Sequence, residues 1–325
     1  MKAIGLVGRP FSGTSTLFTA LTRAGSHAGQ ANRAVVPVPD PRLPVLTEME
    51  RSRKTVFAQV AFVDVPGGTS SAQGIATLRE ADALAIVVRC FGHDASPSAE
   101  LSEVRAHLLL ADQAVVESAL AGATKRARGT TTPEVEALTL ANAALEAETP
   151  LAEAGLTDEH RKELRSMAPL TLKPSVVVAN LEEGADVPPD LPEDSVGVYA
   201  SIEAETAEMD PEEARALLEE FGVREPGLDR VIRASYDALD LITFLTTGED
   251  ESRAWEVRRG AAAPEAAGVI HTDLERGFIR AEVIAYDDLV AAGSMDAAKQ
   301  QGKLRVEGKD YVVREGDVIN VRFAV

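Results

Sequence analysis

Residues 8–15 read Gly-Arg-Pro-Phe-Ser-Gly-Thr-Ser, and this stretch decides the fold. An apolar run at residues 3–7 precedes it and a helical pattern begins directly after it, so the expected order is strand, glycine loop, helix. In that order, G-x-x-x-x-G-K-[ST] loops cradle phosphates, because the glycines permit a tight turn and backbone N–H groups point at the anion. One position departs from the motif, since Thr14 stands where the motif has lysine.

The glycine loop predicts a phosphate site that depends mainly on the backbone. Peptide N–H groups do not depend on side-chain identity, so those of Ser12, Gly13, Thr14 and Ser15 are expected to donate to phosphate. The Ser15 hydroxyl is expected to ligate Mg²⁺. Without the lysine, the site lacks charge-assisted hydrogen bonds of about 1.5–3 kcal/mol each. The sequence therefore predicts weaker triphosphate binding and a larger loss of catalysis.

The composition is that of an ordinary globular chain. Of its 325 residues, 45% are hydrophobic and 26% are charged, and this length allows two or three domains. The formal net charge of −19 argues against a broad nucleic-acid surface, so no DNA partner is expected. No apolar segment approaches the roughly 20 residues of a membrane span. The single cysteine, Cys90, is expected to be a buried structural thiol. We expect a cytoplasmic protein without a membrane partner.

Short apolar strands alternate with helical segments in the first part of the chain. The strands expected at residues 3–7, 56–63, 84–89 and 174–179 indicate a parallel sheet covered on both faces. Gly8 and Asp64 each follow one of these strands, and ligands bind at the carboxyl ends of such strands, so the two residues are expected to meet. Residues 97–167 read as two antiparallel helices that form an arm, packed helix to helix or open to a partner. The last 85 or so residues have β character.

Several segments together resemble the YchF-type, or Obg-like, ATPase family of translation-factor-class P-loop NTPases. The resemblance covers nearly the whole chain, and its terminal motifs are highly specific. Besides the glycine loop, it is carried by Val-Pro-Val-Pro-Asp-Pro-Arg-Leu at 36–43, Phe-Val-Asp-Val-Pro-Gly at 62–67, Val-Ala-Asn at 178–180, Arg-Ala-Trp at 253–255, Gly-Val-Ile-His-Thr-Asp at 268–273, Gly-Phe-Ile-Arg-Ala-Glu-Val at 277–283 and Gly-Lys-Asp-Tyr-Val-Val at 308–313.

The resemblance implies an α/β architecture of three parts. The first is a Ras-like P-loop sheet domain that binds nucleotide, over residues 1–96 and 168–240. An inserted antiparallel helical coiled-coil arm occupies residues 97–167. Residues 241–325 form a TGS domain with the ubiquitin-like β-grasp fold.

Ligands and partners follow from the same resemblance. Asn180 and Glu183 match the family's N-x-x-E pattern, which replaces the guanine-reading N-K-x-D motif, so ATP or ADP is expected in preference to GTP, together with Mg²⁺. The predicted metal ligands are Ser15 and Asp64, and no catalytic residue is predicted. A ribosome or translation factor is the implied partner, with RNA contacted through the TGS domain. The predicted nucleotide-binding residues are Gly8, Ser12, Gly13, Thr14, Ser15, Thr16, Gly67, Asn180 and Glu183.

A small basic group in the last domain bears on the RNA contact. Arg253, Arg258 and Arg259 lie close to Trp255 in the sequence. They are interpreted either as a solvated face or as a contact to RNA or the ribosome.

Two further departures from the family accompany Thr14. The first switch, residues 25–35, is short and lacks a threonine, and Gly68 stands where the family has a hydrophobic residue. A switch that cannot clasp the γ-phosphate cannot easily tell triphosphate from diphosphate. We therefore expect weak nucleotide binding, slow or absent hydrolysis and a regulatory role in translation. Two alternatives stay open: an active Mg²⁺-dependent ATPase or GTPase whose cation comes from a partner or from an arginine such as Arg9, and a structural scaffold without nucleotide.

Overall fold

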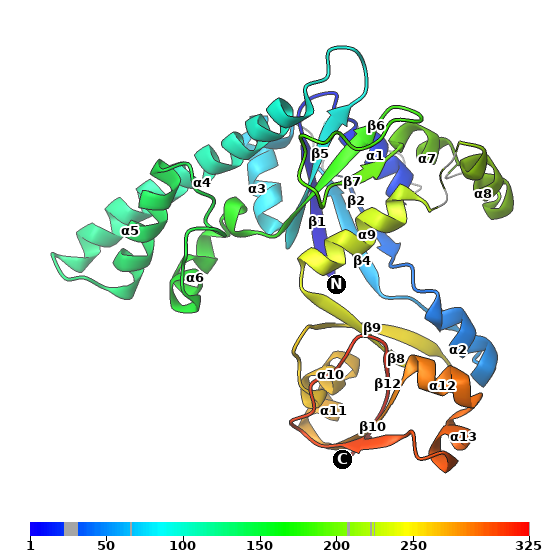
Figure 1. The fold of residues 1–325 in the computed structure, drawn as a ribbon. Coiled ribbons are helices and arrows are strands. Elements are labelled where there is room, and N and C mark those ends of the chain that lie inside the picture. The colour runs from blue at the N-terminus through cyan, green and yellow to red at the C-terminus, as the bar shows by residue number, and fades with distance from the viewer. Residues whose placement is uncertain (23–31, 66, 207–208, 222, 224, 325) are drawn as a thin grey trace. The chain divides into compact units, whose positions relative to one another are not determined.

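Two compact units make up the chain in the computed structural model, which describes residues 1–22, 32–65, 67–206, 209–221, 223 and 225–324. The first unit comprises Met1–Val36 and Val60–Ala238, and the second comprises Pro37–Gln59 and Leu239–Val325. Each unit contains a six-stranded sheet of its own (Figure 1).

The sheet of the first unit is built around β1 (Lys2–Gly8). β1 lies between β4 and β5 and runs parallel to both, with Leu6 opposite Asp64 and Gly8 opposite Val87. The central strands are nearly continuous buried apolar runs, as expected when both faces of a parallel sheet are covered. The strand order is β2-β4-β1-β5-β6-β7, with bounds β2 (Asn32–Pro37), β4 (Gln59–Asp64), β5 (Ala83–Cys90), β6 (Ser175–Leu181) and β7 (Val196–Val198).

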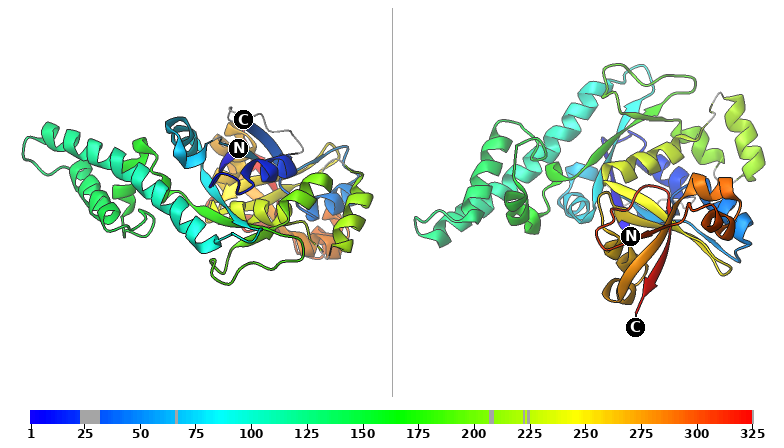
Figure 2. Two further views of the ribbon diagram at one scale, coloured as in Figure 1. Left: turned by 90° about the horizontal axis from the view of Figure 1, so that it is seen from above. Right: turned by 60° about the horizontal axis from the view of Figure 1, so that its bottom comes forward.

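Helices cover this sheet and continue into an arm, which Figure 2 shows from two further sides. The helices of this unit are α1 (Thr14–Thr22), α3 (Ala72–Glu80), α4 (Pro97–Ala127), α5 (Pro133–Glu146), α6 (Asp158–Leu164), α7 (Ala200–Thr206), α8 (Pro211–Glu220) and α9 (Gly227–Ala238), with 3₁₀ turns η1 (Gly68–Ser70), η2 (Arg165–Met167) and η3 (Leu170–Leu172). Across the described ranges, no helix, the long α4 included, is long and apolar enough to cross a membrane.

The apolar stripe of α4 is used in packing along its whole length. Near its start, Leu101, Val104 and Leu108 belong to the same core as the sheet. Further along, α4 packs against α5 in a separate apolar cluster that includes Val116 and Leu138. The base of the arm is thus continuous with the core of the first unit, and only its outer part has a core of its own.

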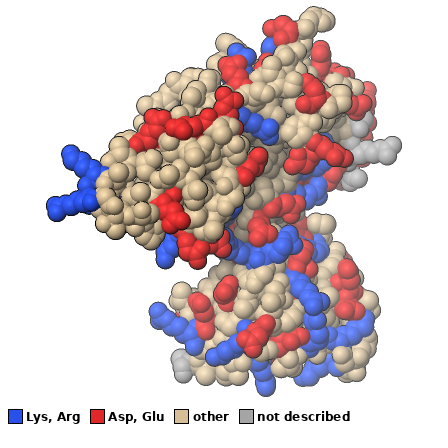
Figure 3. Space-filling view, turned by 60° about the vertical axis from the view of Figure 1, so that its left-hand side comes forward, with Lys and Arg blue, Asp and Glu red and all other residues tan. Residues whose placement is uncertain are grey.

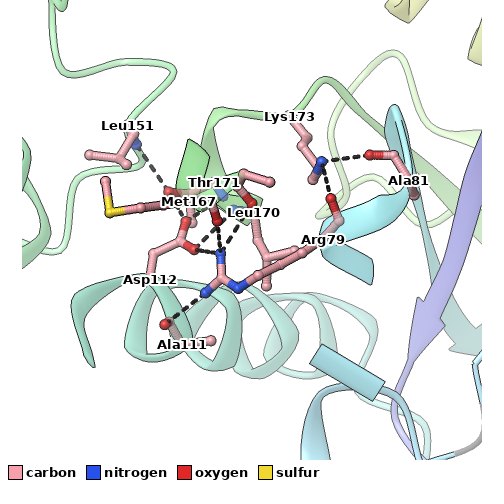
Figure 4. Close-up of polar contacts among 10 residues, drawn as sticks. Arg79, Ala81, Ala111, Asp112, Leu151, Met167, Leu170, Thr171 and Lys173 are labelled. Carbon is pink, nitrogen blue, oxygen red and sulfur yellow. Dashed lines mark hydrogen bonds and ion pairs between the residues drawn. The ribbon is translucent and has the colours of Figure 1, made fainter. Parts of the chain in front are cut away.

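A buried carboxylate, that of Asp112 on α4, joins three segments (Figure 4). Its side chain is fully shielded from solvent and forms an ion pair of 2.8 Å with Arg79 on α3. It also accepts hydrogen bonds from the N–H groups of Leu170 and Thr171, at 2.9 and 2.7 Å, and from the Thr171 hydroxyl at 2.8 Å. Lys173 donates to the backbone carbonyl of Arg79 at 3.0 Å. Asp112 therefore fastens α4 to α3 and to the segment that leads into β6.

The second unit has a mixed sheet with helices packed on it. β12 runs parallel to β8, β8 pairs antiparallel with β9, and Phe244, Val257 and Val283 lie in its buried core. The strand order is β11-β10-β12-β8-β9-β3, with bounds β3 (Thr55–Val56), β8 (Leu241–Thr246), β9 (Ser252–Arg258), β10 (Phe278–Ala285), β11 (Arg305–Glu307) and β12 (Asp317–Phe323). The helices are α2 (Arg42–Glu50), α10 (Ala263–Ile270), α11 (Thr272–Arg276), α12 (Tyr286–Ala292) and α13 (Met295–Gln300).

The segment Pro37–Gln59 belongs to the second unit, whereas the predicted domain boundaries place it with residues 1–96. The single strand expected over residues 56–63 is in fact two strands, since β3 pairs with β9 whereas β4 pairs with β1. The physical reason lies in polar contacts that secure this segment within the second unit. Arg42 forms ion pairs of 2.7 Å with the nearly buried Asp40 and of 2.6 Å with Glu315.

Cys90, at the end of β5, is a partly buried thiol. Burial, followed by the charges of Glu100 and Asp190, raises its pKa to about 12. The thiol is therefore uncharged at neutral pH, although it is buried only in part and not fully as expected.

Replacing Asp112 by alanine is expected to lower the free energy of unfolding by about 3–5 kcal/mol, because the substitution leaves the Arg79 charge without its buried partner. Urea unfolding followed by circular dichroism measures this change. The matched control is Glu134→Ala, which removes an exposed ion pair of 2.6 Å with Arg126 and should cost about 1 kcal/mol or less. Equal losses in the two variants would contradict the role given to Asp112.

Candidate functional site

The glycine loop connects β1 to α1, as the sequence predicts. Two of its residues have positive φ angles, Phe11 at 70° and Gly13 at 93°. A Cβ atom at position 13 would lie 2.1 Å from the Asn180 side-chain nitrogen, so glycine is required there by close approach as well as by conformation. Phe11 is 91% exposed, so a bulky side chain at this turn extends into solvent.

Hydrogen bonds within the loop determine which donors stay available. The Ser12 N–H donates to the Arg9 carbonyl at 3.1 Å, and the Gly13 carbonyl accepts from the Leu17 N–H at 2.9 Å, which closes the first turn of α1. The first N–H groups of a helix have no acceptor within that helix, so they suit an anion at its N-terminus. The backbone donors best placed for phosphate are thus those of the first turn of α1, and the Ser12 N–H is already engaged.

Asp64 and Ser15 meet at the carboxyl edge of the sheet. Asp64 ends β4 and is 2% exposed, and the Ser15 hydroxyl donates to its carboxylate at 3.0 Å. A carboxylate and a hydroxyl are oxygen ligands of the kind Mg²⁺ takes. The described part of the chain has no group of three or more His, Cys, Asp or Glu side chains able to hold a metal. A Mg²⁺ ion here would therefore depend on phosphate oxygens and water as well.

Asn180, at the end of β6, holds the loop from the other side. Its side-chain amide donates to the Ser12 carbonyl at 3.1 Å, and its side-chain oxygen accepts from the Ala200 N–H at 3.4 Å. The residue is buried, and its side chain ties the loop to β6 through Ser12 and ties the start of α7 to β6 through Ala200. Glu183 lies in the turn after β6 and is exposed.

A cavity of about 220 Å³ lies at the glycine loop. Five of the predicted site residues line it: Gly8, Thr14, Ser15, Asp64 and Gly67. The lining described for it does not include the other five: Ser12, Gly13, Thr16, Asn180 and Glu183. The other lining residues are Leu6, Arg9, Pro10, Phe11, Val65 and Gly68. Of these, Arg9 was considered from the sequence as a substitute cation, and Gly68 was noted as a departure from the family. The sequence signal for the others is their position, in β1, in the loop or directly beside Asp64.

The charge at this cavity comes from two side chains. Among the described residues that line it, Arg9 is the one cation and Asp64 the one anion. The Arg9 guanidinium forms an ion pair of 3.0 Å with Glu103 on α4, and each side chain is 43% exposed. Thr14, at the position of the motif lysine, brings no charge to the cavity.

The segment after β4 is also tied to α4. The Thr69 hydroxyl in η1 lies 3.1 Å from Nδ1 of His107, a hydrogen bond in which either group can donate. The Gly68 N–H donates to the Val65 carbonyl at 2.9 Å, which closes a tight turn beside the cavity. The segment directly after Gly67 is thus a short turn in contact with the arm helix.

The first switch falls mostly outside the described residues. Of the predicted residues 25–35, those from 25 to 31 are not described, and those from 32 onward belong to β2. The expectation that this switch lacks a threonine to contact a γ-phosphate stays a prediction from the sequence.

Replacing Gly13 by alanine should destabilise the loop, because the new Cβ would meet the buried Asn180 amide. The matched control is Gly129→Ala, which has a similar φ of 88° but no atom within 4 Å of an added Cβ. Both variants are strained by positive φ, and Gly13→Ala should lose about 1–3 kcal/mol more through overpacking. Equal unfolding free energies for the two variants would show that the Asn180 contact is not restrictive.

Comparisons with known proteins agree with this architecture. The family model YchF-GTPase_C, described as "Protein of unknown function (DUF933)", matches residues 241–324. The chain is 39% identical over 361 residues to "Ribosome-binding ATPase YchF" of Bacillus subtilis and 41% identical over 358 residues to the protein of that name from Haemophilus influenzae, with 99% of each chain covered. The structure of the Schizosaccharomyces pombe YchF GTPase superposes with a TM-score of 0.85 at 29% identity, covering 99% of this chain and 97% of that one.

The predicted fold class, a Ras-like sheet domain with a helical arm and a TGS domain, is confirmed by this structural match together with the family model. Because relatives well above 30% identity align over almost their entire length, the chain belongs to the YchF family.

Proposed function

We propose that this chain is a ribosome-associated protein that binds adenine nucleotide with Mg²⁺ at the glycine loop, hydrolyses it slowly or not at all, and regulates a step of translation. One observation carries the proposal: the cavity is lined by the first residues of α1 and contains the Ser15–Asp64 pair, while Thr14 occupies the lysine position. The printed names of the relatives, which describe ribosome-binding ATPases, support the ribosome and the nucleotide.

Nucleotide binding is supported by parts of the site that do not depend on the missing lysine. The first turn of α1 presents its N–H groups and a positive dipole end to an anion. Ser15 Oγ and Asp64 Oδ2 lie 3.0 Å apart. Both oxygens can approach a Mg²⁺ ion that is also bound by phosphate. Gly67 lines the same cavity, which supports a contact of its backbone with the terminal phosphate.

Slow hydrolysis follows from what the site lacks. Charge that develops on the transferred phosphoryl group needs fixed cations, and Thr14 supplies none. Gly68 has no side chain to position water or exclude it, and it is buried in the turn after β4. Phosphate can therefore be held by the backbone, while the contacts that lower the barrier to transfer are missing.

The preference for adenine is based on the Asn180-x-x-Glu183 pattern. Asn180 is engaged by the loop and by the start of α7, whereas Glu183 is exposed and free to face a base. A base whose polar groups stay unpaired is rejected strongly, so the position of this carboxylate sets the choice of base.

Isothermal titration calorimetry with ATP, ADP, GTP and GDP, with and without Mg²⁺, tests the proposal. ATP and ADP are expected to bind more tightly than their guanine counterparts, and Mg²⁺ should strengthen ATP binding. Phosphate release should stay near background. Heat from none of the four nucleotides would favour the structural scaffold, and rapid ATP turnover would favour an active ATPase with a substitute cation.

Restoring the lysine as Thr14→Lys should tighten ATP binding about 10- to 100-fold, because it adds a charge-assisted contact of about 1.5–3 kcal/mol. Calorimetric titration with ATP measures this change. Thr139→Lys, which places the same charge on an exposed position of α5, is the control and should leave the affinity unchanged. Unchanged affinity in Thr14→Lys would contradict the importance given to position 14.

The ribosome contact is proposed to involve local rather than overall charge, since the chain carries a formal net charge of −19. Figure 3 shows acidic and basic side chains interspersed on the face in view. In the second unit, the Arg253 guanidinium stacks 4.2 Å from the centre of the Trp255 ring, and Arg258 is exposed, whereas Arg259 is paired with Asp240. Arg253, Trp255 and Arg258 are the candidates for an RNA contact through the TGS domain.

Co-sedimentation with ribosomes at two salt concentrations checks this contact. The chain is expected in the ribosomal pellet at low salt and to a smaller extent at high salt, because salt screens contacts with phosphate. Arg258→Glu should reduce the pelleted fraction, with Arg259→Glu as a comparison whose arginine is already paired. Absence from the pellet at low salt would contradict the ribosome proposal.

A further inference from the structure

We infer that Arg9 is the phosphate-binding cation of this chain, and that Glu103 on α4 holds it while no phosphate is bound. It rests on the proposed nucleotide function. It adds that Arg9 binds the phosphate and that this binding affects α4. It starts from the ion pair of 3.0 Å between the two side chains.

Arg9 provides the positive charge among the described residues that line the cavity. Within the described lining, no other residue carries a positive charge, and Asp64 adds a negative one that repels phosphate unless Mg²⁺ is bound. Thr14 is a neutral side chain at the lysine position. A guanidinium suits this role because its planar fork can donate two parallel hydrogen bonds to a phosphate group.

The geometry allows Arg9 to change partners. It directly follows Gly8 at the end of β1, so its backbone is fixed at the mouth of the cavity that it lines. The side chains of Arg9 and Glu103 are each 43% exposed. Exposed ion pairs of this kind are weak because water competes for both charges. A phosphate offers the same donors a stronger anionic acceptor. The guanidinium of this cavity-lining residue is thus held by a contact that is easily exchanged for one with phosphate.

Two other arginines of the first unit, Arg79 and Arg89, are each held by several contacts. Arg79 is bound to the buried Asp112 carboxylate and to backbone carbonyls. Arg89, near the end of β5, is held by Glu100 and Asp94 at once. Neither side chain can reach a phosphate without breaking several contacts, whereas Arg9 gives up one.

The exchange has a consequence for the arm. When Arg9 moves to phosphate, Glu103 loses its partner in the second turn of α4. One turn further on, His107 contacts Thr69 in η1, the turn beside Gly67 and the cavity. Phosphate at the loop would therefore weaken the polar contacts of the first turns of α4. The stability of these turns would then depend on whether the site is occupied.

Calorimetric titration with ATP, ADP and AMP in Mg²⁺ tests the inference on four variants. Arg9→Ala should weaken ATP binding about 10- to 100-fold, and AMP binding should change less because AMP lacks the terminal phosphates. Arg9→Lys should recover part of the affinity. Glu103→Gln frees Arg9, so ATP should bind about two- to fivefold more tightly. Arg126→Ala, which breaks the exposed pair with Glu134 at the far end of α4, is the matched control and should behave as the unmodified chain.

Amide hydrogen exchange gives a readout that does not depend on affinity. At saturating ATP, exchange in residues 97–107 should rise in the unmodified chain and in Arg126→Ala, and it should not rise in Arg9→Ala. ATP binding that survives Arg9→Ala within twofold would overturn this inference and leave the proposed function intact. The absence of ATP binding in the unmodified chain would overturn both.

Discussion

The parallel register between β1 and β4 is the constraint on which the candidate site depends. It sets Leu6 opposite Asp64, so the last residue of β4 arrives where β1 passes into the glycine loop. Side chains alternate between the two faces of a strand, so a slip of one residue would move Asp64 to the other face and away from Ser15. The hydrogen bond of 3.0 Å between these two residues is therefore a product of strand pairing. The buried apolar side chains of both strands keep that register in place.

The loop itself is held by contacts that do not involve position 14. Its turn is closed by backbone hydrogen bonds at Ser12 and Leu17, and its outer side is fixed by the buried Asn180 amide. A change from lysine to threonine alters none of these contacts. The shape of the phosphate loop and its charge are thus separate properties, and a chain can keep the first while it loses the second. This separation explains how Thr14 can occur in a loop of otherwise intact geometry.

The parts of the fold that could be predicted from the sequence are those that depend on residues close together in the chain. The glycine loop and the buried strands could be predicted from glycine spacing and apolar periodicity alone. The meeting of Gly8 and Asp64 at one sheet edge followed from strand order. The assignment of Pro37–Gln59 to the second unit could not be read in this way, because it depends on Arg42 reaching Glu315, far along the chain. The contacts between Arg9 and Glu103 and between Arg79 and Asp112 are long-range pairs of the same kind. The pattern of a single sequence does not indicate which charged side chains will form such pairs.

Three of the polar contacts that α4 makes with other segments of the first unit are unequal, and their order along the helix matters. Arg9 meets Glu103 in an exposed ion pair, and Thr69 meets His107 through one hydrogen bond. Asp112, further along, is fully buried and satisfies several donors. An exposed pair contributes about 1 kcal/mol or less, whereas breaking a buried one costs about 3–5 kcal/mol. A change at the loop can therefore exchange the two weak polar contacts near the start of α4 without breaking those of Asp112, while Leu101, Val104 and Leu108 keep these turns in the core of the sheet. The start of the arm helix can respond to the site while the helix stays anchored to α3.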